Sequence, residues 1–223
     1  MLQSFAFFMI GILGGTFDPV HFGHLRPALE IQQSIGLDEV RLLPSHVPPH
    51  RSQPHATPQQ RLTMLHAAIA ATPVFTVDTR EFERDGPSYT LDTLQSLRAE
   101  LAAASLCLLI GMDAFREFAS WHRWREILDY SHLVVMTRPG MSQPEHGELA
   151  DFSSLHRVAD AATLKSRTSG LLLFHPVTQL EISATRIRKL LASGQRADFL
   201  LPNSVLEVIY SEGLYGTGKQ HDR

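Results

Sequence analysis

The sequence contains a single cysteine, which excludes a disulfide within one chain. Cys107 lies in an apolar run, residues 106–110, where we expect a small buried thiol. The lack of paired cysteines fits a reducing compartment, so we expect the protein to work in the cytoplasm.

The sequence also lacks a dense basic block and a long apolar run. It has 20 Lys and Arg against 23 Asp and Glu, a formal net charge of −3, so no nucleic-acid groove is expected. No segment has the length of a membrane span, so we expect no membrane partner. Residues 1–13 are apolar but carry neither a basic region nor a small-residue cleavage site. We interpret residues 1–8 as an N-terminal extension and the next residues as the first strand.

The composition is that of an ordinary globular protein, with 43% hydrophobic and 19% charged residues among 223, and it favours one α/β domain over residues 1–223. Short apolar runs alternate with helical patterns. Runs that are apolar throughout are typical of strands buried on both faces of a parallel sheet, so we expect a doubly wound, mostly parallel sheet with helices on both faces. Ligands of such sheets bind at the carboxyl ends of the strands. The expected strands are residues 9–13, 40–43, 74–77, 106–110, 133–136 and 171–174.

Helix signals lie between these runs. Thr57, Pro58 and Gln60 are typical of a helix start, with an N-cap threonine and a proline in the first turn, and predict a helix to about residue 71. Residues 88–101 and 183–193 are amphipathic as well. No regular element fits the proline- and histidine-rich loop 45–58, and we expect residues 140–170 to be a peripheral insertion.

The loop after the first strand, residues 14–24, reads GGTFDPVHFGH. Glycines at a strand end let the backbone approach a ligand, and the amides at the start of the following helix favour anions. His21 and His24 are three residues apart and can face one point, with Gly23 expected to leave room for phosphate. Neither the dinucleotide-binding G-x-G-x-x-G pattern nor the Walker A pattern occurs here.

Simpler interpretations of this loop remain open from the residues alone. A glycine pair is often only a turn. Two histidines can ligate zinc, although no cysteine or third histidine stands nearby at a typical ligand spacing.

The string 14–24 resembles, almost residue for residue, the signature of the nucleotidyltransferase superfamily with its H-x-G-H element, and specifically that of the bacterial nicotinate-nucleotide adenylyltransferases. The resemblance implies a Rossmann-like fold and transfer of the adenylyl group of ATP to nicotinate mononucleotide, with release of pyrophosphate, in NAD biosynthesis. One departure is His122 after Trp121, where close relatives often carry tyrosine. Further segments match in order over nearly the entire chain: residues 48–51, 87–90, 111–113, 120–121, 137–140 and 182–188.

The resemblance also implies roles for individual residues on the ATP side. His21, His24 and Arg188 are expected to be catalytic, the histidines at the α-phosphate and the arginine at the β- and γ-phosphates. A Mg²⁺ ion held mainly by the ATP phosphates is implied by the chemistry, without a metal site built by the protein. The other expected ATP-binding residues are Gly14, Gly15, Thr16, Phe17, Gly111, Asp113, Ile182, Ser183 and Thr185.

On the acceptor side, Trp121 is expected to stack on the pyridine and Tyr89 and Thr90 to bind its substituent. The mononucleotide phosphate is assigned to three basic residues, His50, Arg51 and Arg138. The residues alone allow other interpretations: Trp121 as a core aromatic, His50 and Arg51 as a solvated loop tip, and Asp113 as a helix N-cap.

Rival functions share part of this evidence. The acceptor could instead be nicotinamide mononucleotide or pantetheine phosphate, the transferred group could be cytidylyl, or the chain could be a nucleotide sensor without catalysis. Tyr89, Thr90 and Trp121 argue against pantetheine phosphate and cytidylyl transfer, and the retained histidines and Arg188 argue against a sensor. The sequence leaves assembly into a homo-oligomer open.

Overall fold

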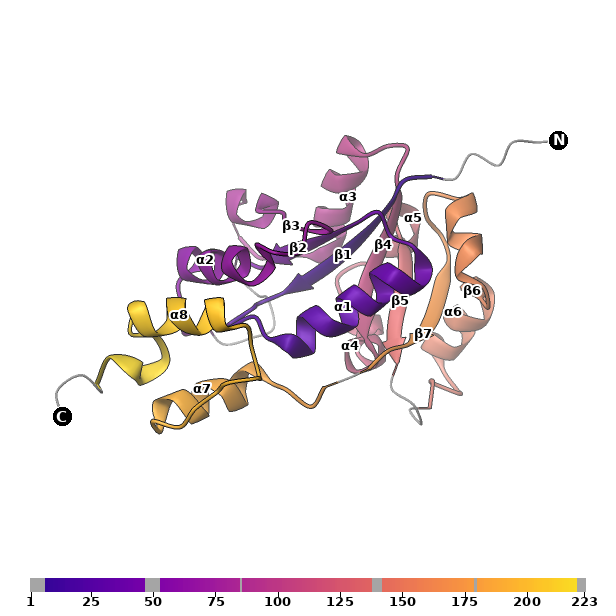
Figure 1. Ribbon diagram of the computed structural model, residues 1–223. Coiled ribbons are helices and arrows are strands. Elements are labelled where there is room, and N and C mark those ends of the chain that lie inside the picture. Colours follow the sequence, from indigo (N-terminus) through magenta and orange to yellow (C-terminus); the bar gives the residue numbers. More distant parts are fainter. Residues whose placement is uncertain (1–6, 47–52, 85, 138–141, 179, 220–223) are drawn as a thin grey trace.

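The computed structural model describes residues 7–46, 53–84, 86–137, 142–178 and 180–219. A seven-stranded sheet runs through their middle in the order β3-β2-β1-β4-β5-β7-β6, and every neighbouring pair is parallel (Figure 1). The strands are β1 (Met9–Gly15), β2 (Glu39–Pro44), β3 (Phe75–Val77), β4 (Ser105–Gly111), β5 (His132–Thr137), β6 (Arg157–Val158) and β7 (Leu172–Pro176).

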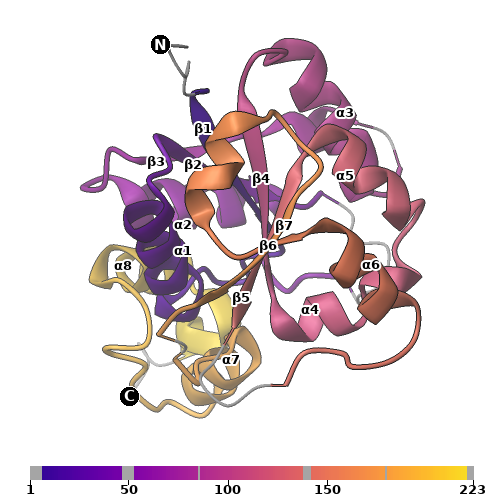
Figure 2. The ribbon, with the colours of Figure 1, turned by 90° about the vertical axis from the view of Figure 1, so that its right-hand side faces the viewer.

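Helices cover both faces of this sheet (Figure 2). The helices α1 (Phe22–Ile35), α2 (Pro58–Ile69), α7 (Ala184–Ala192) and α8 (Asn203–Ser211) share one apolar core with one face. The helices α3 (Thr90–Glu100), α4 (Met112–Arg116), α5 (Ile127–Tyr130) and α6 (Glu148–His156) share a second core with the other. Short 3₁₀ turns complete the fold: η1 (Arg80–Glu83), η2 (Phe118–Ser120), η3 (Trp124–Glu126), η4 (Ala161–Ser166) and η5 (Leu214–Lys219).

Alternation along β1 shows why the strands are apolar throughout. Met9 and Leu13 belong to the first core, and Ile10 and Ile12 belong to the second. Each strand residue therefore meets a helix layer whichever way its side chain points. This confirms the doubly wound α/β fold that the sequence predicts.

The expected strands and helices are present, with ends that differ by a residue or two. Thr57 caps α2 as predicted, its side chain accepting a hydrogen bond from the Gln60 N–H at 3.3 Å. The sequence did not indicate β6, which has two residues and lies in the segment 140–170 together with α6 and η4. Leu164 of η4 is fully buried in the first core, so part of this segment contributes to the core of the domain.

The order of the strands places the site. From β1 the chain moves outward through β2 to β3 and then returns to β4 on the other side of β1. The chain leaves β1 toward β2 and leaves β4 toward β5, on the opposite side of the sheet. Because these two connections diverge, a crevice opens beyond the carboxyl ends of β1 and β4. Gly14 and Gly15 end β1 there, and Gly111 ends β4. Within the described ranges, no helix is long and apolar enough to cross a membrane.

Candidate active site

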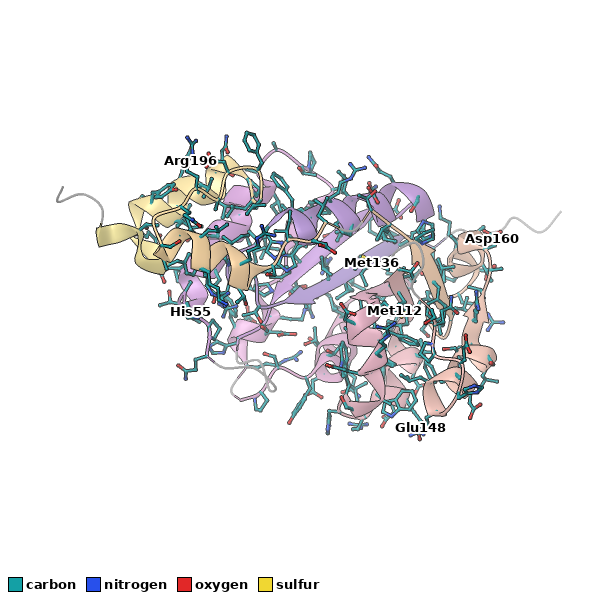
Figure 3. All side chains as sticks on the ribbon, turned by 90° about the horizontal axis from the view of Figure 1, so that it is seen from below. His55, Met112, Met136, Glu148, Asp160 and Arg196 are labelled. Carbon is teal, nitrogen blue, oxygen red and sulfur yellow. The ribbon has the colours of Figure 1, made fainter. Side chains whose placement is uncertain are left out.

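A cleft of about 900 Å³ lies at this crevice. Its walls come from the loop after β1, the ends of β4 and β5, and the start of α7. Met112 directly follows β4 and Met136 lies near the end of β5; both are labelled in Figure 3, which views the molecule from below. Every residue that the sequence assigns to ATP lines this cleft: Gly14, Gly15, Thr16, Phe17, His21, His24, Gly111, Asp113, Ile182, Ser183, Thr185 and Arg188.

The glycines at the strand ends do two different things. No atom lies within 4 Å of the position that a Cβ would take at Gly14 or at Gly111, so the backbone is open there to a ligand. A Cβ on Gly15 would lie 2.9 Å from the ring of Phe17. Phe17 has a positive φ of 49° and is 1% exposed, so its ring fills the space below Gly15 and supports the loop from beneath.

His21 and His24 lie together at the start of α1. The backbone N–H of His21 donates to Nδ1 of His24 at 3.3 Å, and the two rings stack with their centroids 3.8 Å apart. Since Nδ1 of His24 accepts, the proton of a neutral His24 ring lies on Nε2. The structure thus puts the N–H donor of the His24 ring on the side opposite to the His21 main chain.

His21 is buried and uncharged. Its side chain lies at the helix start with 4% of the residue exposed, and burial lowers the pKa of its imidazole to about 4. Its Nδ1 has no hydrogen-bond partner among the described residues. In the free protein near neutral pH, His21 therefore presents a neutral ring rather than a fixed positive charge.

The expectation for Gly23 was wrong. The space at its missing Cβ is already taken: a Cβ there would lie 2.9 Å from Nδ1 of His21 and 3.0 Å from the carbonyl oxygen of Ile182. Gly23 therefore makes room for the His21 ring and for the segment that leads into α7, not for phosphate. The missing side chain at the glycine of H-x-G-H thus leaves space for the ring of the first histidine.

Arg188 reaches the cleft from α7. Ser183 caps this helix, its Oγ accepting from the Arg186 N–H at 3.2 Å, as its place in the predicted helix suggests. The guanidinium of Arg188 donates from Nη1 to the carbonyl oxygen of Asp18 at 2.6 Å and from Nη2 to Oγ1 of Thr185 at 3.3 Å. The same Nη1 lies 3.8 Å from the Asp18 carboxylate. Arg188 is thus held beside the loop that carries the histidines.

Asp113 lies in the first turn of α4, and its side chain is 82% exposed at the cleft. The alternative interpretation, that Asp113 caps this helix, is wrong because the N-cap position is Gly111. The carboxylate is left facing solvent at the cleft, with one distant ion pair to Arg116 at 4.0 Å. It is placed to accept hydrogen bonds from a bound molecule.

A second cavity of about 130 Å³ adjoins the cleft. The two share Gly14, Gly15, Leu109, Ile110 and Trp121, so Trp121 borders both. Thr90, the first residue of α3, lines the smaller cavity, whereas Tyr89 lines neither and stacks on His122 with the ring centroids 4.5 Å apart. Of the remaining acceptor residues, His50, Arg51 and Arg138 lie outside the described residues.

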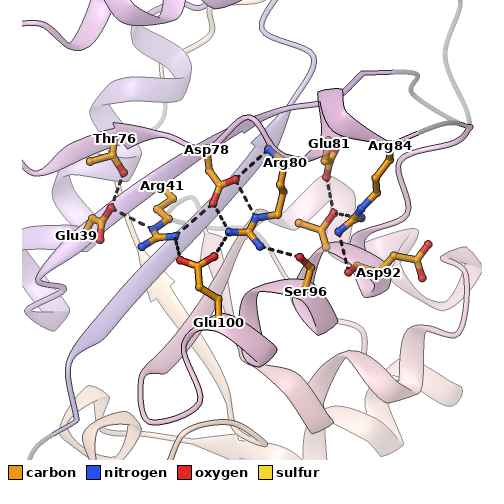
Figure 4. Close-up of polar contacts among 11 residues, drawn as sticks. Glu39, Arg41, Thr76, Asp78, Arg80, Glu81, Arg84, Asp92, Ser96 and Glu100 are labelled. Carbon is orange, nitrogen blue, oxygen red and sulfur yellow. Dashed lines mark hydrogen bonds and ion pairs between the residues drawn. The ribbon is translucent and has the colours of Figure 1, made fainter.

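Ion pairs and hydrogen bonds join η1 to α3 next to the smaller cavity, as Figure 4 shows for the side chains. Arg80 of η1 bonds to Asp78 and, at 2.7 Å, to Glu100 of α3. The next residue, Glu81, is 7% exposed, lines the small cavity and accepts from Oγ1 of Thr93 at 2.8 Å. Burial raises the pKa of the Glu81 carboxyl. The network therefore holds η1 against the helix whose start lines this cavity.

Arg61 supports the loop of the site from inside the protein, and sequence reasoning missed it. It is fully buried, and its Nη1 donates to the carbonyl oxygens of Thr16 and Ser45, each at 2.8 Å. The side chain thus joins the loop after β1 to the residue after β2. A signal was present, because Arg61 lies on the same helix face as the buried Met64 and Leu65, where a charged residue is unusual.

The comparisons with known proteins agree with this geometry. Residues 12–190 match the model of the family described as cytidylyltransferase-like. The chain is 48% identical over 206 residues to a protein of Aeromonas salmonicida named probable nicotinate-nucleotide adenylyltransferase, with 92% of this chain and 96% of the relative covered. A protein of Aeromonas hydrophila with the same name is 50% identical over 206 residues, at the same coverage of 92% and 96%. The chain belongs to the nicotinate-nucleotide adenylyltransferase family.

A solved structure of this family shares the fold. It is the Plasmodium falciparum nicotinic acid mononucleotide adenylyltransferase complexed with NaAD, which is 16% identical with a TM-score of 0.69 and covers 93% of this chain and 97% of its own. The family and the Rossmann-like fold that the sequence predicts are both confirmed.

Proposed function

We propose that this chain transfers the adenylyl group of ATP to nicotinate mononucleotide, giving nicotinate adenine dinucleotide and pyrophosphate. The observation that carries the proposal is the cleft itself. The residues assigned to ATP from separate parts of the sequence line one cavity, and Trp121 joins it to a smaller cavity at the start of α3. That arrangement offers a triphosphate site and a ring-sized side pocket in contact with each other.

The reaction needs no protein nucleophile. The phosphate oxygen of the mononucleotide is already ionised, and it attacks the α-phosphorus of ATP in line as the bond to pyrophosphate breaks. The difficulty lies in bringing two polyanions together and in stabilising the charge that moves onto the leaving group. Preorganised donors in a fixed loop supply this stabilisation.

The described residues divide this work. Nε2–H of His24 donates to the α-phosphate, and the open backbone at Gly14 lets the phosphates approach the loop. Arg188 donates to the carbonyl oxygen of Asp18, in the loop that carries the histidines, and holds the β- and γ-phosphates of ATP. Asp113 accepts from the ribose hydroxyls, and the remaining ATP contacts come from the Ile182–Ser183 segment and Thr185 at the start of α7.

On the acceptor side, Trp121 stacks on the pyridine, and its substituent enters the smaller cavity toward the first backbone N–H groups of α3, near Tyr89 and Thr90. His50, Arg51 and Arg138 remain our proposal for the phosphate of this substrate. His21, which is neutral in the free protein because burial lowers its pKa to about 4, lines the cleft beside His24 and remains our proposal for a second catalytic contact at the α-phosphate.

Mg²⁺ is proposed to enter with the ATP phosphates and to neutralise part of their charge. The donor set of the cleft fits this mode of binding. Asp18, the buried carboxylate of the cleft, is already bonded to His55, Ala56 and Tyr215, and within the described ranges no three His, Cys, Asp or Glu side chains gather to hold a metal. Oxygen ligands from the substrate would then supply most of the coordination.

Pyrophosphate release tests the proposal. The purified protein is assayed with Mg²⁺ and ATP or CTP, and with nicotinate mononucleotide, nicotinamide mononucleotide or pantetheine phosphate as the acceptor in turn. We expect release with ATP and nicotinate mononucleotide at the highest kcat/KM. Release that is fastest with CTP or with pantetheine phosphate would replace the proposed reaction, and no release with any pair would favour a sensor.

A further inference from the structure

The carboxylate of Asp18 joins segments that lie far apart in the sequence. It is 5% exposed, and it accepts from the backbone N–H groups of His55 at 2.8 Å and Ala56 at 3.1 Å, just before α2. Its Oδ1 also accepts from the hydroxyl of Tyr215 at 2.7 Å. On the other side, its Oδ2 lies 3.8 Å from Nη1 of Arg188. A buried carboxylate with this many donors has little freedom to move.

Tyr215 comes from the C-terminal turn η5 and is held in an unusual backbone conformation. Its φ is 55°, in the left-handed region that non-glycine residues rarely adopt, and Gly216 beside it has a φ of 87°. Such strain persists only where the surrounding structure enforces it, and it is often found next to functional sites. Burial, together with the charge of Asp18, raises the pKa of Tyr215, so its hydroxyl stays protonated and keeps donating.

The turn also has contacts that do not involve this hydroxyl. Leu214 is 8% exposed and packs in the first core, and Oγ1 of Thr217 donates to the carbonyl oxygen of Leu214 at 2.9 Å and lies 3.3 Å from that of Ile209. These contacts hold η5 against α8 without Tyr215. The Tyr215–Asp18 bond is therefore an additional contact, directed at the loop that carries the site.

We propose that Tyr215 is a positioning residue for the ATP site: its hydroxyl fixes the Asp18 carboxylate, which sets the position of Arg188 and of the chain entering His21. The bonds run in sequence, from the Tyr215 hydroxyl to Oδ1 of Asp18 and from Asp18 to Arg188 through its carbonyl oxygen at 2.6 Å. His21 follows Asp18 by only three residues. Loss of the hydroxyl should loosen the grip on the triphosphate while leaving the pocket beside Trp121 unchanged.

The inference rests on ATP being the nucleotide of the proposed function, and Tyr215→Phe tests it by removing one oxygen and keeping the ring. Tyr210→Phe is the matched control, since Tyr210 is a half-exposed tyrosine on α8. We measure the Kd for ATP without acceptor, the KM for ATP and for nicotinate mononucleotide, and Tm. The expected result for Tyr215→Phe is a Kd and KM for ATP raised about tenfold, as for one hydrogen bond to a charged group, with the KM for the acceptor within about twofold. Tyr210→Phe should match the wild type.

A cycle with Asp18→Asn identifies the route. If Tyr215 acts through Asp18, the double variant Asp18→Asn, Tyr215→Phe should bind ATP no more weakly than Asp18→Asn alone. Additive losses would overturn the inference, as would an unchanged Kd for ATP in Tyr215→Phe or an equal loss for both substrates that follows a lower Tm. Measuring ATP binding without the acceptor separates the role of Tyr215 from the proposed reaction. If Tyr215→Phe raises the Kd for ATP but the wild type releases no pyrophosphate, the inference is supported and the proposed reaction is rejected. If the wild type does not bind ATP, both are rejected.

Discussion

The backbone N–H of His21 donates to Nδ1 of His24, so the first histidine of the site fixes the ring of the second through its main chain. The bond places the proton of a neutral His24 ring on Nε2, the atom that we propose donates to the α-phosphate. The backbone at the start of α1 therefore helps to set the orientation of the His24 ring, in addition to the rotamer preference of the side chain.

His24→Ala should therefore lower kcat by about 10² to 10³, the usual loss for one preorganised donor, while the fold survives. The measurement is steady-state pyrophosphate release together with a thermal melt. His66→Ala, at an exposed histidine of α2, is the control and should leave both unchanged. Near-normal turnover of a folded His24→Ala protein would remove His24 from the mechanism.

Arg188→Ala should chiefly raise the KM for ATP, because the guanidinium is placed at the phosphates and not at the acceptor. Lysine should substitute poorly, since it cannot reproduce the two separate bonds from Nη1 and Nη2 to Asp18 and Thr185. Kinetics with each substrate varied in turn measures this, with Lys189→Ala on the exposed side of α7 as the control. A change confined to the acceptor would reverse the assignment.

Gly23→Ala should be damaging although it adds a single methyl group. The new Cβ would lie 2.9 Å from Nδ1 of His21 and 3.0 Å from the backbone oxygen of Ile182, and the latter cannot simply rotate away. We expect a loss of about 1–3 kcal/mol in the free energy of unfolding and a drop in kcat, measured by urea unfolding and by turnover. Gly218→Ala, whose Cβ would meet nothing nearer than 3.6 Å, is the control. Wild-type behaviour of Gly23→Ala would contradict the packing described above.

Stability should fall in mild acid. His132 is fully buried, with Nδ1 accepting from the Leu171 N–H at 3.1 Å and Nε2 lying 3.1 Å from the Arg167 carbonyl oxygen, and burial lowers its pKa. Burial also lowers the pKa of His21 to about 4. Because only the unfolded chain takes up these protons near pH 6, stability is complete above about pH 6.5 and falls as the pH drops toward 4.

His21 should contribute a slope of up to about 1.4 kcal/mol per pH unit, and His132 should add a slope of the same sign. Urea unfolding at pH 7.5, 6 and 5 measures it. His132→Asn should unfold more easily at pH 7.5 and show a shallower slope, whereas His66→Ala should keep the wild-type slope. Equal slopes in all three proteins would exclude His132 as a source of the pH dependence.

Nicotinate mononucleotide should be preferred over nicotinamide mononucleotide by at least about tenfold in kcat/KM. A carboxylate accepts from each N–H at the start of α3, whereas a carboxamide turns an NH₂ group toward them, which costs about 1–3 kcal/mol for each unsatisfied group. Glu81, which lines the same cavity, already accepts a hydrogen bond from Oγ1 of Thr93. Both acceptors are compared at fixed ATP and Mg²⁺. Equal kcat/KM values for the two mononucleotides would reject the proposed carboxylate pocket at the start of α3, but they would not reject adenylyl transfer.

Local signals made the sheet predictable. The apolar runs gave the long strands, and the cap residues Thr57 and Ser183 gave two helix starts. The two-residue β6 was not predictable, because a strand that short has no periodicity and forms only where β7 offers an edge.

The candidate site was predictable where its residues lie in one short string or match the family. Asp18 lies within that string, but its hydrogen bond to Tyr215 joins residues 197 positions apart. No local sequence pattern predicts such a contact. Gly23 was misjudged for a related reason: the sequence shows that a side chain is missing but not which neighbour fills the space.

The position of β1 inside the sheet has a consequence for synthesis on the ribosome. β1 pairs with β2 on one side, but its other edge pairs with β4, Met9 lying opposite Ser105. The chain emerges from its N-terminus, so this edge has no partner until the fourth strand has been made, and Arg188 and Tyr215 arrive later still. In a nascent chain, this edge of β1 therefore stays unpaired until β4 has been made. Unpaired strand edges bind chaperones or pair with the wrong strand. The nascent chain acquires its complete nucleotide site only after residue 215 has been made.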